Sequence, residues 1–104
     1  MVKVVWSDAA LMDLDDIGNY IAKDSLRYAQ LTVKRLFNSV DILEKNPSIG
    51  KELQEFDNEK IRELIRFNYR IVYFLVDEYR IDILTVHRCE RLPGNAFDFD
   101  KLEK

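Results

Sequence analysis

The chain has 104 residues, of which 47% are hydrophobic and 34% are charged, and its formal net charge is −3. This length and composition fit one folded domain with its own core, and they exclude a disordered or fibrous protein. The net negative charge argues against strong non-specific binding of nucleic acid, which normally needs a basic surface.

The cysteine count, the apolar runs and the N-terminal segment indicate where in the cell the protein is expected. The single cysteine, Cys89, cannot form an intramolecular disulfide, which favours a reducing environment. No apolar run approaches the roughly 18 residues that a membrane-spanning helix needs. The short apolar opening is followed at once by Ser7-Asp8, unlike a secretory signal. We therefore expect a soluble, cytoplasmic protein with no membrane partner.

The N-terminal part of the chain predicts a strand and two helices. Residues 2–6 combine β-branched and aromatic types, as in a short strand. Ser7 can cap a helix over 8–23, and a second helix with the same apolar period covers 25–45. Pro47 ends this second helix, because the residue before a proline avoids helical geometry. The short connection between the helices predicts an antiparallel hairpin.

The first predicted helix carries carboxylates at close spacing. Asp13 and Asp16 lie three residues apart and therefore on one side of the helix. Paired carboxylates serve general acid–base catalysis in some enzymes. A solvated helix face explains this pair more simply, so we interpret both residues as solvent-facing.

The C-terminal half predicts a loop and three strands. Residues 47–60 are polar and predict a loop, with a short turn of structure near 53–56. Three segments rich in β-branched and aromatic residues follow, at 61–67, 69–76 and 80–88. Connections of hairpin length join them, and Asn68 tolerates the left-handed backbone of a tight turn. The stretch 71–76 is apolar on both faces, which predicts the central strand of an antiparallel meander.

The order of elements is therefore β-α-α-β-β-β. A helical hairpin packed on one face of an antiparallel sheet is an α+β fold. We expect the domain to span residues 1–104, with 93–104 as a loosely docked tail. No internal repeat, linker or low-complexity segment divides the chain.

The chain lacks the common sequence signatures of a cofactor or metal site, so we expect neither. It has no Gly-rich phosphate loop, no Cys/His metal-ligand spacing and no nucleophile elbow. The candidate functional residues are instead basic residues of the predicted sheet and its end: Arg70, His87, Arg88 and Arg91. An antiparallel meander can bring such residues together on one concave face. The alternative is a purely structural Arg70 that pairs with Glu63 or Asp82 across the strands.

Several segments resemble the ParE/RelE family of toxins. Ile-Arg-Glu-Leu at 61–64 and Asn-Tyr-Arg-Ile-Val-Tyr at 68–73 resemble the central motif of this family. The segment 86–93 is similar to the ParE-type ending, a His followed by Arg and then a Leu-Pro pair. The opening and the loop match as well, at Trp6-Ser7, Ala9, Asp13-Leu14, Ile17, Tyr20-Ile21-Ala22, Asp24-Ser25, Pro47 and Gly50. The resemblance covers residues 4–93, and its order and spacing make it specific.

The resemblance implies the toxin of a type II toxin–antitoxin system of the plasmid stabilisation type, which inhibits growth until an antitoxin covers it. ParE-type members act on DNA gyrase, whereas RelE-type members are endoribonucleases that cut mRNA on the ribosome. We expect the gyrase-directed mechanism, in which the chain is not an enzyme, because the ParE-type ending matches. In addition, no Tyr follows the last predicted strand and no strongly basic surface is available to face RNA.

The candidate residues have different roles under the alternatives. In a gyrase inhibitor, Arg70, His87, Arg88 and Arg91 would contact the target and be needed for toxicity. In a ribosome-dependent mRNA endoribonuclease, the catalytic residues would be Arg70, His87, Arg91 and Glu55, with Arg70 stabilising phosphate charge and His87 or Glu55 moving the proton. A second alternative is a family member that binds its antitoxin but is not toxic.

The antitoxin surface is expected on the helical hairpin and the exposed sheet face, where an amphipathic partner segment adds apolar contacts. Its residues on the helices would be Leu11, Leu14, Tyr28 and Leu36. Because the chain is not basic, we expect apolar contacts to dominate this interface, with only local pairs that involve arginine.

Overall fold

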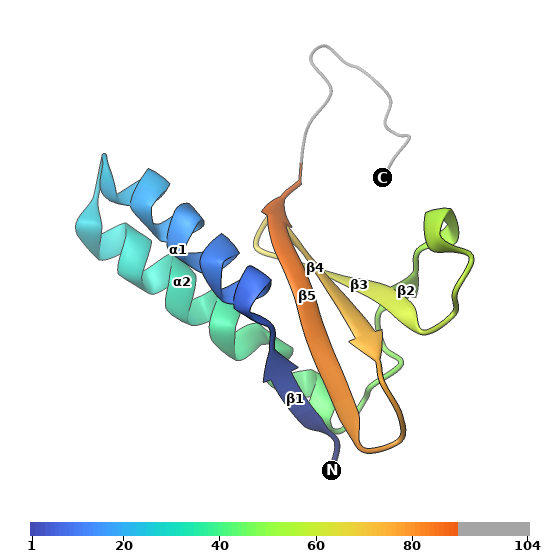
Figure 1. Cartoon of the computed structure of the whole chain (residues 1–104). Helices are drawn as coiled ribbons and strands as arrows, with labels where there is room; N and C mark the ends of the chain where they lie inside the picture. The colour runs from blue at the N-terminus through green and yellow to red at the C-terminus, as the bar shows by residue number, and fades with distance from the viewer. Residues whose placement is uncertain (90–104) are drawn as a thin grey trace.

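The computed structural model describes residues 1–89. Helices α1 (Asp8–Ala22) and α2 (Leu26–Ser39) form an antiparallel hairpin along one side of a five-stranded sheet (Figure 1). The strands and 3₁₀ helices are β1 (Lys3–Trp6), η1 (Val40–Glu44), β2 (Lys51–Glu52), η2 (Gln54–Phe56), β3 (Ile61–Arg66), β4 (Tyr69–Leu75) and β5 (Arg80–Arg88). The predicted α+β fold class is confirmed. Within the described part of the chain, no helix is long and apolar enough to cross a membrane.

Serine side chains cap both helices. The Ser7 hydroxyl accepts a hydrogen bond from the backbone N–H of Ala10 at 3.1 Å. The Ser25 hydroxyl accepts the equivalent bond from Tyr28 at 3.1 Å. Each bond satisfies one of the N–H groups that the first helical turn leaves without an intrahelical partner. Local side-chain chemistry therefore sets where each helix begins, as the sequence predicts.

The second helix changes geometry before its predicted end. The predicted helix over 25–45 is α-helical only as far as Ser39 and continues as the 3₁₀ helix η1. In a 3₁₀ helix, residues three apart lie above one another. Val40 and Leu43 are therefore both turned into the core, where their side chains are 2% and 0% exposed.

The strand order is β1-β5-β4-β3-β2, so β4 is the central strand, as its two apolar faces predict. β3, β4 and β5 form the predicted antiparallel meander. The expectation of a wholly antiparallel sheet is corrected by β1, which pairs with β5 in parallel, with Val4 opposite Ile81. The two-residue strand β2, inside the predicted loop, extends the sheet beyond β3 with Glu52 opposite Arg62.

The turn between β3 and β4 uses two residues with left-handed backbone. Phe67 has a φ of 53° and Asn68 a φ of 73°. Asn accepts this conformation, as predicted, whereas a left-handed Phe is strained by its Cβ atom. Two positive φ values match the right-handed twist of the strands. The turn therefore sets the register that places Arg70 opposite Ile65.

The core lies between the hairpin and one face of the sheet. Its buried members are Ala10, Leu14, Leu36, Val40, Leu43, Leu64, Ile71, Tyr73, Ile81, Ile83 and Val86. The Tyr73 hydroxyl accepts a hydrogen bond from Gly50 N at 2.8 Å and donates one to Pro47 O at 2.9 Å. A Cβ atom on Gly50 would lie 2.5 Å from this hydroxyl, so the close approach requires glycine. Burial raises the pKa of the Tyr73 phenol, which therefore stays protonated and holds the loop that leads to β2.

Removal of the Tyr73 hydroxyl should destabilise the protein. Tyr73→Phe leaves the buried N–H of Gly50 without its acceptor, so we expect the free energy of unfolding to fall by about 1–3 kcal/mol. Urea denaturation measures this change. Tyr79→Phe, at a position that is 73% exposed, is the matched control and should change it by less than about 0.5 kcal/mol. Equal stability of wild type and Tyr73→Phe would contradict the assigned role.

Candidate functional site

The strand register brings two of the predicted residues together. Arg70 in β4 lies directly opposite His87 in β5, and Ile65 in β3 lies on its other side. Residues opposite each other in antiparallel strands point to the same face, whereas the next residue, Ile71, points into the core beneath the helices. Arg70 and His87 therefore lie on the sheet face that is turned away from the hairpin. We call this the open face and define it by Glu63, Ile65, Arg70 and His87.

A charged pair orients Arg70 on the open face. Its Nε donates to Glu63 Oε1 at 2.6 Å, and the two side chains are 35% and 15% exposed. Of the two structural pairings considered for Arg70, the one with Glu63 is present, while Asp82 binds Arg80 at 2.7 Å. The pair engages only one side of the guanidinium. The Nη groups have no hydrogen-bond partner among residues 1–89, and a guanidinium can use such N–H groups to bind a carboxylate or phosphate.

Cys89 lies beside this pair. Its backbone N–H donates to Asn68 O at 2.9 Å, which ties the end of β5 to the β3–β4 turn. Burial raises the pKa of the Cys89 thiol; the charge of Arg70 lowers it and that of Glu63 raises it further. The protonated thiol is a poor nucleophile. Nowhere in the described residues do three or more His, Cys, Asp or Glu side chains gather as metal ligands.

The other predicted residues do not join the open face. Arg88 follows His87 in β5 and lines a depression of about 500 Å³ at the end of the hairpin, beside Tyr20 and Tyr28. The prediction that Arg88 converges with His87 is wrong, because successive residues of a strand point to opposite faces. Glu55 is exposed on η2, in a separate part of the molecule. Arg91 lies outside the described residues.

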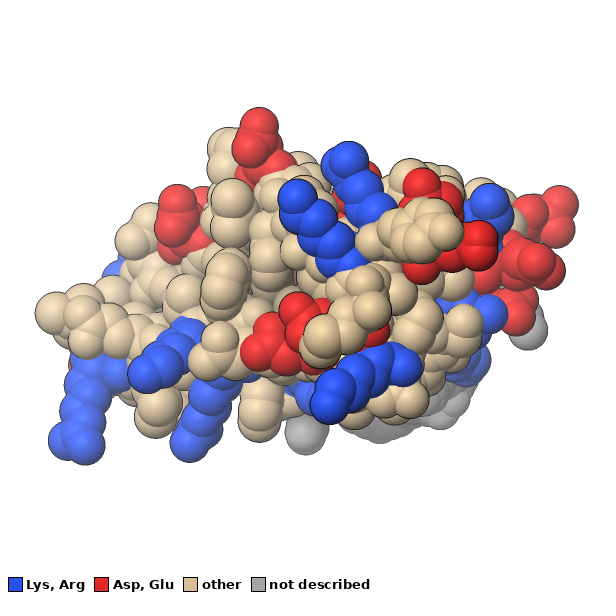
Figure 2. Space-filling model, turned by 90° about the horizontal axis from the view of Figure 1, so that it is seen from below, with Lys and Arg blue, Asp and Glu red and all other residues tan. Residues whose placement is uncertain are grey.

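Acidic side chains gather around β2 and η2. Figure 2 shows them at the right-hand end of the molecule, with both signs of charge interspersed over the rest of that face. The exposed carboxylates of this region are Glu52, Glu55, Asp57 and Glu59. Such a surface repels the phosphate backbone of RNA. The position of Glu55 is therefore unsuited to a role as a base acting on mRNA.

Asp13 has a role that the sequence does not reveal, and its interpretation as a solvent-facing residue is wrong. Its Oδ2 accepts hydrogen bonds from Thr85 Oγ1 at 2.6 Å and from Val86 N at 2.9 Å. The pairing of β1 with β5 stops at Ile83, so the outer edge of β5 has no strand partner beyond that point. Asp13 satisfies the backbone there and holds the part of β5 that carries His87.

Loss of the Asp13 carboxylate should therefore weaken the fold. Asp13→Ala leaves the Val86 N–H unsatisfied at a partly buried edge, and we expect the free energy of unfolding to fall by about 1.5–3 kcal/mol. Urea denaturation gives this value, and amide hydrogen exchange at Val86 should accelerate. Asp15→Ala, an exposed carboxylate on the same helix, is the control and should leave both unchanged. Slow exchange at Val86 in Asp13→Ala would refute the contact.

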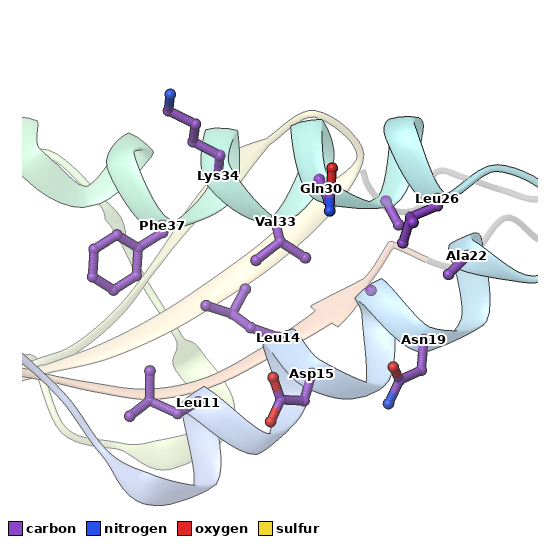
Figure 3. Close-up of a pocket in the computed structure, with 12 residues that line it drawn as sticks. Leu11, Leu14, Asp15, Asn19, Ala22, Leu26, Gln30, Val33, Lys34 and Phe37 are labelled. Atoms are coloured by element: carbon purple, nitrogen blue, oxygen red, sulfur yellow. The ribbon is translucent and has the colours of Figure 1, made fainter.

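A second surface lies on the hairpin. A groove of about 740 Å³ runs between α1 and α2, and Figure 3 shows side chains from both helices meeting in it. Its apolar lining residues include Leu11, Leu14, Ala22, Leu26, Val33 and Phe37. A Cβ atom on Gly18 would lie 3.0 Å from Val33 Cγ2, so glycine lets the two helices approach closely. Phe37 also stacks on Trp6, with ring centroids 5.2 Å apart.

The structure separates the four residues expected to contact the antitoxin. Leu11 lines the groove and is 41% exposed, whereas Leu14 forms its floor and is only 4% exposed. Tyr28 is 56% exposed but lies at the depression at the end of the hairpin. Leu36 is completely buried in the core, so its expected place on a binding surface is wrong. Phe37, the next residue along the helix, is 47% exposed and lines the groove instead. The apolar period of three to four residues in the sequence is consistent with this position.

Comparison with known proteins identifies the family. Residues 4–93 match the family described as “ParE toxin of type II toxin-antitoxin system, parDE”. The chain belongs to the ParE toxin family. It is therefore a ParE-type toxin of a toxin–antitoxin system, as the resemblance of its motifs predicts. No curated protein matches the chain.

Solved structures agree with this ParE fold. The structure described as the chromosomal ParDE toxin–antitoxin system from P. aeruginosa is similar with a TM-score of 0.70 and 24% identity, over 86% of this chain and 98% of that chain. The RelBE2 toxin–antitoxin complex from Mycobacterium tuberculosis is similar with a TM-score of 0.51 and 23% identity, over 84% of this chain and 96% of that chain. At these identities the likeness concerns the fold alone, and one fold serves different activities.

Proposed function

We propose that this ParE-type toxin inhibits growth by acting on DNA gyrase, and that a cognate antitoxin neutralises it by binding the helical groove. The observation that carries the proposal is the make-up of the open face. On this face Arg70 lies beside the apolar residue Ile65. The Nη groups of Arg70 bind no other residue of the described range 1–89. Arginine next to apolar surface is typical of a protein-binding hot spot.

The open face is less suited to RNA cleavage. Attack by a 2′-hydroxyl needs a base and an acid on either side of the phosphate, with cations for the developing charge. Glu63 is already engaged by Arg70 at 2.6 Å, and Glu55 lies on an exposed loop among other carboxylates. Among the described residues of the open face, His87 is the remaining candidate for a proton-transfer role.

One observation favours the ribonuclease alternative and makes it worth testing in parallel. Arg70 and His87 are direct cross-strand neighbours, whose Cβ atoms in an antiparallel pair are about 5 Å apart, so a guanidinium and an imidazole share one face. A single phosphate group can contact both side chains at this separation. Under this alternative, Arg70 would neutralise the phosphate and His87 would protonate the leaving oxygen.

The antitoxin part of the proposal concerns the groove between α1 and α2. Exposed apolar residues such as Leu11, Leu26 and Phe37 line it, and an amphipathic helix can bury them. The groove lies on the opposite side of the hairpin from the sheet. Binding there covers no open-face residue directly, so neutralisation requires either a longer partner segment that continues to the open face or steric exclusion of gyrase.

Supercoiling of relaxed plasmid by DNA gyrase, with and without the purified chain, is the deciding experiment. We expect inhibition that increases with toxin concentration. Cleavage of mRNA on purified ribosomes is measured in parallel with the same preparation. Ribosome-dependent cleavage without gyrase inhibition would replace the proposal with the ribonuclease alternative. Inactivity in both assays, with no effect on growth when the chain is expressed, would indicate a non-toxic member of the family.

A further inference from the structure

The two helices of the hairpin carry opposite charge. All charged residues of α1 are acidic, namely Asp8, Asp13, Asp15 and Asp16. All charged residues of α2 are basic, namely Arg27, Lys34 and Arg35. This segregation exceeds what a solvated surface needs, because interspersed charges solubilise a helix equally well.

Only some of these charges face the groove. Asp8 and Asp15 are seven residues apart, as are Arg27 and Lys34, and this spacing places each pair along one line of its helix. Asp15 and Lys34 line the groove, and Figure 3 shows them on its α1 side and its α2 side. We call Asp8 and Asp15 the acidic rim, and Arg27 and Lys34 the basic rim.

The remaining charges of the hairpin have other positions. Asp13 binds the edge of β5, Asp16 lines the depression at the end of the hairpin, and Arg35 lies over the ring of Phe67. The four rim residues are exposed, and none forms an ion pair with another residue of the described range 1–89. The groove is thus an apolar floor between an acidic rim and a basic rim, with both rims free to pair with a ligand.

We propose that the groove takes an amphipathic helix that carries basic residues on the flank facing α1 and acidic residues on the flank facing α2, and that this charge order sets the direction in which the helix lies. The occupant is the antitoxin segment, and for that identity the inference rests on the proposed function. Apolar contacts with the floor supply most of the affinity, whereas the rims select the orientation.

Reversal of a bound helix shows why direction follows from charge. If the helix is turned end for end on the same apolar stripe, its two flanks change places, and each attractive contact with a rim becomes repulsive. One exposed ion pair changes affinity by about two- to fivefold. With two charges on each rim, the wrong direction should bind about tenfold more weakly than the right one. Salt should reduce this difference, because the rims are exposed.

The test uses designed helical peptides of about 21 residues, roughly 30 Å long, with a constant apolar stripe. The first peptide has one basic flank and one acidic flank, the second has the flanks exchanged, and the third has two acidic flanks. A nitroxide at either end reports direction by quenching Trp6, the single tryptophan, which stacks on Phe37 at one end of the groove. We expect opposite ends of the first and second peptides to quench Trp6, and the third to bind about tenfold more weakly.

Charge exchange on the toxin gives the complementary result. The double variant Asp15→Lys with Lys34→Glu leaves one charge of each sign on each rim at constant net charge and should abolish the preferred direction of the first peptide. Glu78→Lys with Lys60→Glu makes the same exchange at exposed residues outside the groove and should leave the direction unchanged. Gyrase supercoiling is measured on both variants, since neither changes the open face. If neither variant inhibited gyrase supercoiling, this result would count against the proposed function alone.

The inference is overturned if the third peptide binds as tightly as the first two, or if the same end quenches Trp6 in the first and the second peptide. It is also overturned if no peptide binds, or if sedimentation shows that the chain forms a dimer whose dissociation opens the groove. In that last case the occupant is a second copy of the chain. None of these outcomes bears on gyrase inhibition, so the two proposals fail separately.

Discussion

Arg70→Ala is expected to abolish growth inhibition while the fold is retained. Arg70 is the best-placed cation of the open face, because Glu63 orients its guanidinium and leaves the Nη groups without a described partner. Truncation of a charged group in a binding contact typically costs about 2–5 kcal/mol, which corresponds to roughly 30-fold or more in affinity for the target. Growth after induced expression and inhibition of gyrase supercoiling both measure this loss.

Two control variants separate a binding role from a structural one. Arg80→Ala removes another arginine–carboxylate pair of similar length, with Asp82 at 2.7 Å, and should leave toxicity intact. Glu63→Gln removes the charge that orients Arg70 and should weaken inhibition only partly. If Glu63→Gln and Arg70→Ala lost activity equally, toxicity would depend on the Arg70–Glu63 ion pair rather than on Arg70 alone. Full toxicity of Arg70→Ala would exclude the open face as the target-binding surface.

Leu36→Ala is expected to cause the largest loss of stability. The side chain is 0% exposed within the core between the hairpin and the sheet. Removal of a buried leucine costs the transfer free energy of the lost atoms and leaves a cavity, together about 3–5 kcal/mol. This is a large part of the 5–15 kcal/mol that stabilises a typical domain. Urea denaturation, monitored by circular dichroism, measures it.

The same variant decides whether Leu36 contacts a partner. Leu31→Ala, on the same helix at a position that is 41% exposed, is the control and should cost less than about 1 kcal/mol. Leu36→Ala should bind the groove peptides normally under conditions where it is folded. A weaker peptide affinity with unchanged stability would restore Leu36 to the binding surface and contradict its burial.

Local features of the chain were sufficient to predict most elements of the fold. Both helix starts follow from Ser7 and Ser25, whose hydroxyls bond to the N–H groups of their own first turns. The central position of β4 follows from apolar residues on both of its faces. The family motifs also lie within continuous segments. Each of these signals is contained in neighbouring residues, where period and backbone geometry are directly visible.

The candidate site was predictable only in part. The cross-strand position of Arg70 opposite His87 follows from a meander with a short turn. The Arg–Glu pairing was one of two alternatives, because the sequence alone does not give the register that selects Glu63 over Asp82. That Arg88 points to the sheet face opposite to that of His87 could have been inferred from the alternation of side chains along the strand. The segregation of charge between the helices is also visible in the sequence, but its position beside a groove is not.

What the sequence determined by itself is thus the two helices, the four longer strands, their order and the family. Only the tertiary structure decided that β1 pairs in parallel with β5, that Asp13 binds the edge of that strand, and that Leu36 is in the core rather than on the groove. The bonds of Asp13 join residues 72 and 73 positions apart. Periodicity describes one element at a time, whereas such contacts depend on how elements pack, and packing is the outcome of all of them together.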